Sequence, residues 1–167
     1  MWRIVLLVAA LAAPGIAHAQ SRFTGQLDIY SFNAPDGWTP YTDRGYADVA
    51  YDAPGGKSQG GIFAGLKDAE RSLSDEVTSF IGSDALQERR TLTIDGMPCE
   101  FASVVKEGYI RNSMLLCHFS VPFSDGPVAL EFFLGSAAPV ASADWQMVIF
   151  WQAANSIAWG AAFEPAP

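Results

Sequence analysis

The two cysteines are the residues whose type and spacing most directly suggest chemistry. Cys99 and Cys117 lie nine residues on either side of Gly108, so a hairpin that turns at this glycine places them opposite each other. An exported chain with two cysteines most simply pairs them, and closing a loop of about 18 residues is worth roughly 3 kcal/mol. A thiol-based active site is the alternative, but the sequence has no Cys-x-x-Cys motif.

His118 is the one histidine that follows the N-terminal leader predicted below. Because it alternates with Cys117 along a strand, we expect it on the opposite face of the sheet, together with Met114 and Leu116. A zinc site there would need three further ligands drawn from carboxylates, which is an uncommon set. We therefore predict no catalytic residue, no metal site and no cofactor.

Asp43, Asp48 and Asp52 form the densest group of carboxylates. Asp48 and Asp52 would share a strand face and could bind calcium weakly with backbone oxygens, although their spacing matches no twelve-residue calcium loop. A solvated face is the favoured interpretation, and weak calcium binding stays an alternative.

Two short motifs resemble catalytic signatures without completing them. Gly56, Lys57 and Ser58 match the end of a phosphate-binding loop, but Tyr51 stands where its first glycine is required. A hairpin turn is the better interpretation. The sequence also lacks the Gly-x-Ser-x-Gly pattern of a hydrolase nucleophile elbow.

The aromatic residues suggest a contact surface. Aromatic side chains are favoured at protein interfaces, but they also fill the space between a sheet and its helices. Both interpretations stay open. The candidate partner surface consists of Trp38, Tyr41, Tyr46, Asp48, Tyr51 and Asp52.

The hairpin that carries the cysteines runs from Thr91 to Val121 and has a register that the sequence can test. If Cys99 faces Cys117, no like charges meet across the two strands. The other pairs in this register are Phe101 with Leu115, Ser103 with Ser113, Val105 with Arg111, Ala102 with Met114, and Val104 with Asn112.

Alternation with period two predicts the other strands, separated by turn residues. They run over residues 23–32, 46–51, 59–66, 86–94 and 128–134. In the third of these, Gly60, Gly61 and Gly65 indicate a bulge or a close backbone approach. Asp95 and Gly96 are a strong signal for a two-residue hairpin turn.

Two stretches have helical periodicity instead. The first contains Leu73, Val77, Phe80 and Ile81, can be capped by Ser72 or Ser74, and can end at Gly82. The second opens at Ser142 or Asp144 and runs to about Trp159. Its apolar stripe is broad enough to cover a sheet.

Residues 1–19 have the pattern of a secretory signal peptide, with Arg3 before a short apolar run and a small-x-small site that ends at Ala19. We therefore predict cleavage near Ala19 and a periplasmic or secreted protein. Residues 20–162 would form a single domain, and residues 163–167 a disordered tail. No apolar run reaches the roughly 20 residues that span a bilayer.

The chain carries 18 acidic and 10 basic residues, a net charge of −8, and cleavage would also remove Arg3. This balance disfavours nucleic acid as a partner. It is typical of a soluble protein, and it also fits a basic protein partner attracted by the field of the acidic chain. We expect a monomer or weak dimer.

The order of strands, helix, antiparallel strands and helix predicts the α+β class, with two helices packed on a single antiparallel sheet of about six to seven strands. The Pro-Asp-Gly-Trp turn at Pro35 to Trp38, the Leu-Thr-Ile-Asp-Gly stretch at Leu92 to Gly96 and the closing helix resemble the PsbP/Mog-type group of small α+β domains. That resemblance covers most of the mature chain in element order and implies no functional residue.

Members of this group include photosystem accessory proteins, a nuclear-transport cofactor, effector chaperones and periplasmic immunity proteins. We expect a non-enzymatic, exported protein-interaction module, with immunity to a secreted toxin as one concrete form. The alternatives are a periplasmic carrier that holds a small apolar ligand between sheet and helix, and an accessory or chaperone protein. A hydrolase that uses His118 is the least favoured.

Overall fold

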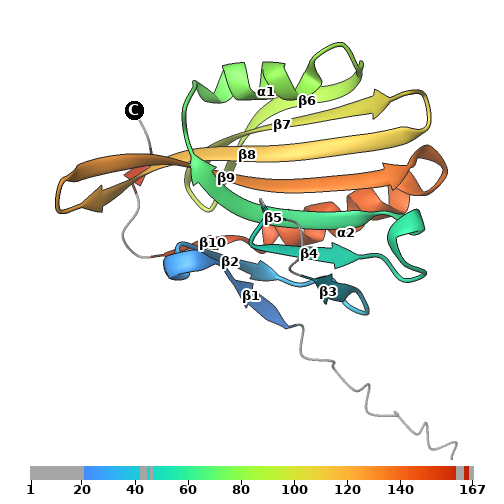
Figure 1. The fold of residues 1–167 in the computed structure, drawn as a ribbon, viewed down its shortest axis with the longest axis horizontal. Coiled ribbons are helices and arrows are strands. Elements are labelled where there is room, and N and C mark those ends of the chain that lie inside the picture. The colour runs from blue at the N-terminus through green and yellow to red at the C-terminus, as the bar shows by residue number, and fades with distance from the viewer. Residues whose placement is uncertain (1–20, 42–44, 46, 161–163, 166–167) are drawn as a thin grey trace, which may run out of the picture.

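The computed structural model describes residues 21–41, 45, 47–160 and 164–165 and shows three layers (Figure 1). A large antiparallel sheet lies in the middle. Helix α1 (Leu73–Ile81) covers one face, while helix α2 (Ala143–Asn155) and a smaller sheet lie against the other. The predicted signal peptide lies outside the described residues.

The large sheet has seven strands in one path, and an eighth short strand pairs with β8. The path runs β3 (Thr39–Tyr41), β4 (Val49–Asp52), β5 (Gly61–Asp68), β9 (Gly126–Pro139), β8 (Ile110–Phe123), β7 (Met97–Lys106) and β6 (Ala85–Ile94). The eighth strand is β11 (Glu164–Pro165). Two residues of the predicted disordered tail are therefore strand, and the others lie outside the described residues.

The prediction of a single sheet is wrong, because a second sheet contains β1 (Arg22–Thr24), β2 (Tyr30–Asn33) and β10 (Ala158–Trp159). The strand predicted over residues 23–32 breaks at the 3-10 turn η1 (Gln26–Asp28). Leu27 and Asp28 both have a φ of 55°, which ends the extended backbone and folds β1 back along β2. Alternation alone does not reveal such a break.

The hairpin register is confirmed. Cys99 lies opposite Cys117, and every other pair predicted from that register is present between β7 and β8. Asp95 and Gly96, with φ of 46° and 83°, form the turn from β6 to β7. Both central residues of a tight hairpin turn need positive φ, which explains the Asp-Gly pair.

Helix α1 begins and ends where its sequence predicts. The Ser72 hydroxyl accepts a hydrogen bond from the backbone N–H of Asp75, and Gly82 closes the helix with a φ of 52°. Helix α2 is shorter than predicted, since it ends at Asn155 and the chain then forms β10 beside β2. Among the described residues, neither helix is long and apolar enough to cross a membrane.

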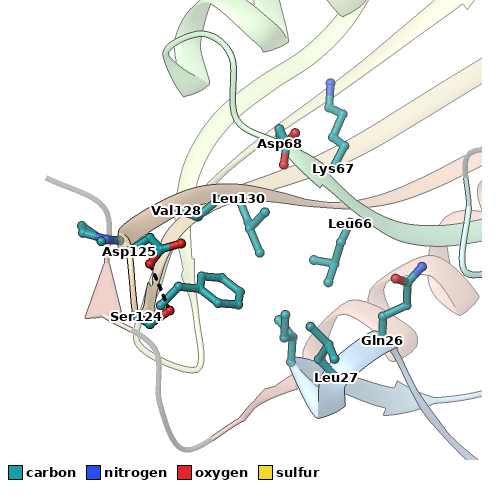
Figure 2. Close-up of a pocket in the computed structure, with 13 residues that line it drawn as sticks. Gln26, Leu27, Leu66, Lys67, Asp68, Ser124, Asp125, Val128 and Leu130 are labelled. Atoms are coloured by element: carbon teal, nitrogen blue, oxygen red, sulfur yellow. Dashed lines mark hydrogen bonds between the residues drawn. The ribbon is translucent and has the colours of Figure 1, made fainter.

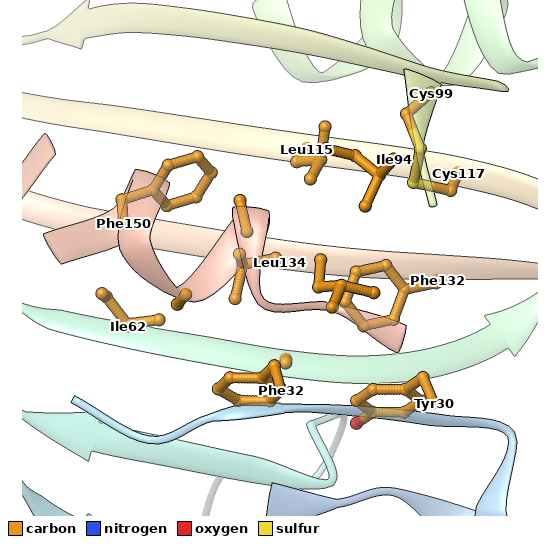
Figure 3. Close-up of a cluster of buried hydrophobic side chains, with 14 of the residues drawn as sticks. Tyr30, Phe32, Ile62, Ile94, Cys99, Leu115, Cys117, Phe132, Leu134 and Phe150 are labelled. Carbon is orange, nitrogen blue, oxygen red and sulfur yellow. A yellow bond between two sulfur atoms is a disulfide. The ribbon is translucent and has the colours of Figure 1, made fainter. Parts of the chain in front are cut away.

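Two apolar cores lie on opposite faces of the large sheet. The main core joins Leu115, Phe132 and Leu134 of that sheet to Tyr30 and Phe32 of β2 and to Phe150 of α2 (Figure 3). The second core joins Val77 of α1 to Ala102, Leu116 and Phe133.

Candidate functional site

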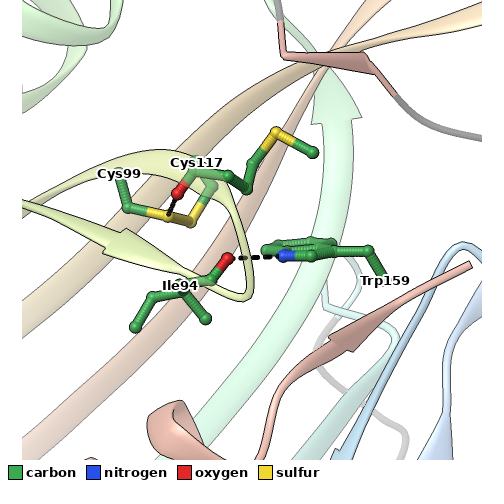
Figure 4. Close-up of a disulfide and its surroundings, with 5 residues drawn as sticks. Ile94, Cys99, Cys117 and Trp159 are labelled. Carbon is green, nitrogen blue, oxygen red and sulfur yellow. Dashed lines mark hydrogen bonds between the residues drawn. A yellow bond between two sulfur atoms is a disulfide. The ribbon is translucent and has the colours of Figure 1, made fainter.

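The predicted disulfide is present and lies inside the main core. The sulfur atoms of Cys99 and Cys117 are 1.99 Å apart, and both side chains are buried. The indole N–H of Trp159 donates to the carbonyl of Ile94 beside this bridge, 2.8 Å away (Figure 4). The bridge is part of the packed interior, which is the structural role expected of it.

The aromatic members of the candidate partner surface divide between core and edge. Trp38 and Tyr51 are only 7% and 5% exposed, and they pack on Trp145 and Phe32 respectively. Their prediction as surface residues is wrong, because the sheet edge needs large rings to fill the space beneath it. Tyr41 is half-buried, and Tyr46 lies outside the described residues.

The two acidic members of that surface, Asp48 and Asp52, are half-buried and do not share a contact partner in the contacts described below. The Asp48 carboxylate accepts hydrogen bonds from Gln26 Nε2 at 2.6 Å and from the Tyr30 hydroxyl at 2.8 Å. Burial, strengthened by this Asp48 contact, raises the pKa of Tyr30 far above its usual range. Through these hydrogen bonds Asp48 holds the N-terminal segment to the large sheet. Asp52 lies separately, at the end of β4.

The weaker motifs do not come together as sites within the described part of the chain. No three histidine, cysteine, aspartate or glutamate side chains there cluster as metal ligands. Asp43, the third carboxylate of the calcium alternative, lies outside that part. Lys57–Gln59 forms a single 3-10 turn in the connection between the antiparallel strands β4 and β5, in agreement with the hairpin interpretation.

Sequence reasoning missed the most unusual group of charges, which occupies one row across three strands. Glu131 of β9 lies opposite Lys67 of β5 on one side and His118 of β8 on the other. Its carboxylate is fully buried and lies 3.0 Å from Lys67 Nζ and 2.7 Å from His118 Nε2. His118 points to the face opposite Cys117, as predicted, and its partner Glu131 lies on the next strand of the same hairpin, whereas Lys67 comes from a strand distant in sequence.

Lys67 also reaches helix α1. Its Nζ lies 3.5 Å from the Glu76 carboxylate. Burial lowers the pKa of Lys67, but the charges and hydrogen bonds of Glu131 and Glu76 outweigh this effect and raise it above its usual value. The lysine therefore stays charged and links the sheet to the helix.

A groove of about 320 Å³, which we name the helix groove, adjoins this row of charges beneath α1. On β5 and β9, Phe63 lies opposite Gly135 and Phe133 opposite Gly65. A Cβ at Gly135 would lie 2.2 Å from the Phe63 ring, and one at Gly65 would lie 2.7 Å from the Phe133 ring. Each ring therefore extends over the glycine of the neighbouring strand, with the two ring planes inclined by 56°, and the close approach predicted at Gly65 is confirmed.

A second groove, the tip groove, has a volume of about 600 Å³. It lies between η1, the end of β5 and the tip of the β8–β9 hairpin (Figure 2). Its apolar residues include Leu27, which is 79% exposed, and Phe123, which is 48% exposed. Asp68 and Asp125 also line it, and neither is predictable as a site residue without the strand order.

Comparison with known proteins identifies the fold. No protein-family model matches this sequence, and no curated protein matches it. The structure is similar to the solution structure of cyanobacterial PsbP (CyanoP) from Synechocystis sp. PCC 6803, with a TM-score of 0.54 and 14% identity over 89% of this chain and 98% of that one.

It is also similar to the crystal structure of LpqN, a protein involved in cell envelope biogenesis of Mycobacterium tuberculosis. The TM-score is 0.53, with 15% identity over 90% of this chain and 88% of that one. Identities this low establish the fold and nothing further. The resemblance expected from the sequence is confirmed at that level: the chain has a PsbP-like α+β fold.

Proposed function

We propose that this protein is a non-enzymatic, exported binding module whose tip groove takes an apolar segment of a basic protein partner. Export is supported by the leader pattern of residues 1–19 and by the buried disulfide. The binding role depends on one observation, the apolar and acidic tip groove.

The apolar lining of the tip groove is exposed to an unusual extent. Leu27, Phe123 and Val128 are 79%, 48% and 38% exposed, and all three line this groove. Leu27 also has a φ of 55°, a conformation that costs a leucine about 1–2 kcal/mol. An exposed, strained leucine beside other exposed apolar residues favours an interaction surface.

The charges around the groove specify the partner. Asp68 and Asp125 line it, whereas the ammonium of Lys67 is held by Glu131 and Glu76. The matching ligand is therefore a protein segment with an apolar residue flanked by lysine or arginine. A secreted toxin with such a segment is one concrete partner, and a protein that blocks it in this way acts as an immunity protein.

The test is capture of partners from periplasmic extract with the mature protein and two double variants. We expect Leu27→Ser/Phe123→Ser to lower capture of a specific partner at least tenfold, because it removes the two most exposed apolar contacts. Asp68→Asn/Asp125→Asn should leave weaker binding with a shallower salt dependence. Val148→Ser is the control, since Val148 is 58% exposed but lies on α2.

Three results would contradict the proposal. If a captured protein binds all of these variants equally, or binds independently of salt, the tip groove is not its binding site. If no protein is captured in a salt-sensitive way from the extract of the source organism, the protein-interaction function itself is rejected.

A further inference from the structure

We propose that the helix groove is a separate binding site for a small cationic amphiphile, a molecule with an ammonium head on an apolar body. The groove lies on the face of the sheet that carries α1, and its volume of about 320 Å³ falls in the range of small-molecule sites. This inference does not depend on the protein-binding role of the tip groove.

The floor of the groove suits an apolar body. Phe63 and Phe133 lie across Gly135 and Gly65, with ring centroids 6.3 Å apart. Because any side chain larger than hydrogen at either glycine would displace these rings, the sequence keeps an aromatic surface here, in which the two ring planes are inclined by 56°. The remaining apolar walls come from Phe80, Met114 and Leu116.

One end of the groove is charged. Glu76, Glu131 and Lys67 all line it, so two carboxylates face one ammonium group. Glu131 is fully buried and is held between Lys67 and His118. The Glu76 side chain is 16% exposed, and its carboxylate lies 3.5 Å from Lys67 Nζ, which is a long hydrogen-bond distance. The carboxylate can therefore accept a further hydrogen bond from a ligand.

This arrangement selects the charge of the ligand head. The three charged groups that line the groove, Lys67, Glu76 and Glu131, carry a net charge of about −1, which favours a cation and disfavours a carboxylate. An ammonium head can form a charge-assisted hydrogen bond to Glu76.

Three probes that share an indole ring distinguish a cationic, an anionic and a neutral head group. Tryptamine is the cation, indole-3-propionate the anion and 3-(indol-3-yl)propan-1-ol the neutral compound. Titration of the ¹⁵N-labelled mature protein by NMR should show tryptamine binding at least fivefold more tightly than the other two. The shifted amides should lie in α1, β5 and β9.

Variants then test each part of the groove. Glu76→Gln should weaken tryptamine binding about tenfold, and Phe63→Ala should weaken it at least as much. Phe63→Leu keeps the apolar volume without the ring face and covers the case in which Phe63→Ala does not fold. Asp84→Asn removes one carboxylate beyond the end of α1, outside the groove lining, and should leave binding unchanged.

Several results would overturn the proposal. They are tighter binding of indole-3-propionate than of tryptamine, absence of binding by all three probes, or equal weakening by Glu76→Gln and Asp84→Asn. A response confined to amides around η1 and the β8–β9 hairpin would place the ligand in the tip groove and would also reject it. Loss of protein capture by Leu27→Ser/Phe123→Ser has no bearing on these measurements.

Discussion

At the scale of single residues, the buried carboxylate of Glu131 is the feature with the largest energetic consequence. A fully buried charge is costly unless it is paired, and Glu131 is paired on both sides, by Lys67 and His118. The residue alternates with Leu130 and Phe132, so its polar position on β9 is visible in the sequence. Its Lys67 partner is not, because that contact depends on the pairing of β5 with β9, whereas His118 lies across the β8–β9 hairpin.

Replacing Glu131 by alanine should therefore destabilise the protein strongly. We expect Glu131→Ala to lower the free energy of unfolding by about 2–3 kcal/mol, because it removes the buried acceptor of His118 and the nearer carboxylate of Lys67, as measured by urea titration. Glu88→Ala is the matched control because Glu88 and its partner Arg90 are about half exposed. That variant should change stability by less than about 1 kcal/mol. Equal losses in both variants would contradict the proposed importance of burial.

The pKa values of Tyr30 and Lys67 predict a loss of stability at alkaline pH. Both pKa values are raised on folding, from 10.0 and 10.5 respectively, so the folded state binds these protons more tightly than the unfolded state. Stability is unaffected below these values and falls as pH rises above them, by up to about 1.4 kcal/mol per pH unit for Tyr30. Lys67 contributes less because it is half exposed.

Urea titrations of the wild type and of Tyr30→Phe between pH 9 and about 11.5 would test this. Phenylalanine cannot ionise, so the variant should start less stable at pH 9 and lose less on alkalisation. A wild-type stability that stays constant to about pH 11.5 would contradict the prediction.

At the scale of elements, the β7–β8 hairpin is the part that the sequence predicts best. Its register follows from the two cysteines and from the glycine between them, all within a short stretch of chain. Helix α1 is similar, since its cap, apolar spacing and terminal glycine are all local signals. The end of α2 was mispredicted because the residues after Asn155 pair with β2, which is a distant strand.

Removing the disulfide should destabilise this hairpin without changing its register. The bridge joins residues 18 apart, and the chain-entropy estimate for such a loop is about 3 kcal/mol. We expect Cys99→Ala/Cys117→Ala to lose about this amount in urea titration while keeping the wild-type pattern of β7–β8 amide protection. The bridge would be unimportant for stability if the loss were below about 1 kcal/mol.

At the scale of the whole molecule, Trp159 connects the two sheets. It belongs to β10 of the smaller sheet, donates to the Ile94 carbonyl at the end of β6, and packs on Phe119 and Phe132 of the large sheet. A residue near the C-terminal end thus ties the N-terminal strands to the disulfide hairpin. This connection between the two sheets through Trp159 explains why the main core is continuous from β2 to β7.

Trp159→Ala should cost about 3 kcal/mol through the cavity it leaves, and it should loosen the smaller sheet first. Trp159→Phe should cost only about 1 kcal/mol because it keeps a ring and loses the hydrogen bond. Urea titration measures both values, and hydrogen exchange shows where protection is lost. Uniform loss of protection across both sheets in Trp159→Ala would reject the idea that Trp159 joins separable layers.

The sequence by itself determined what depends on neighbouring residues: the α+β class, the first helix with its caps, the Asp-Gly turn and the cysteine register. Only the tertiary structure decided the second sheet, the burial of Trp38 and Tyr51, the row of Lys67, Glu131 and His118, and both grooves. The physical reason is that capping, turn geometry and alternation act over a few residues. Strand order and the pairing of Lys67 with Glu131 depend on contacts between segments far apart in the chain.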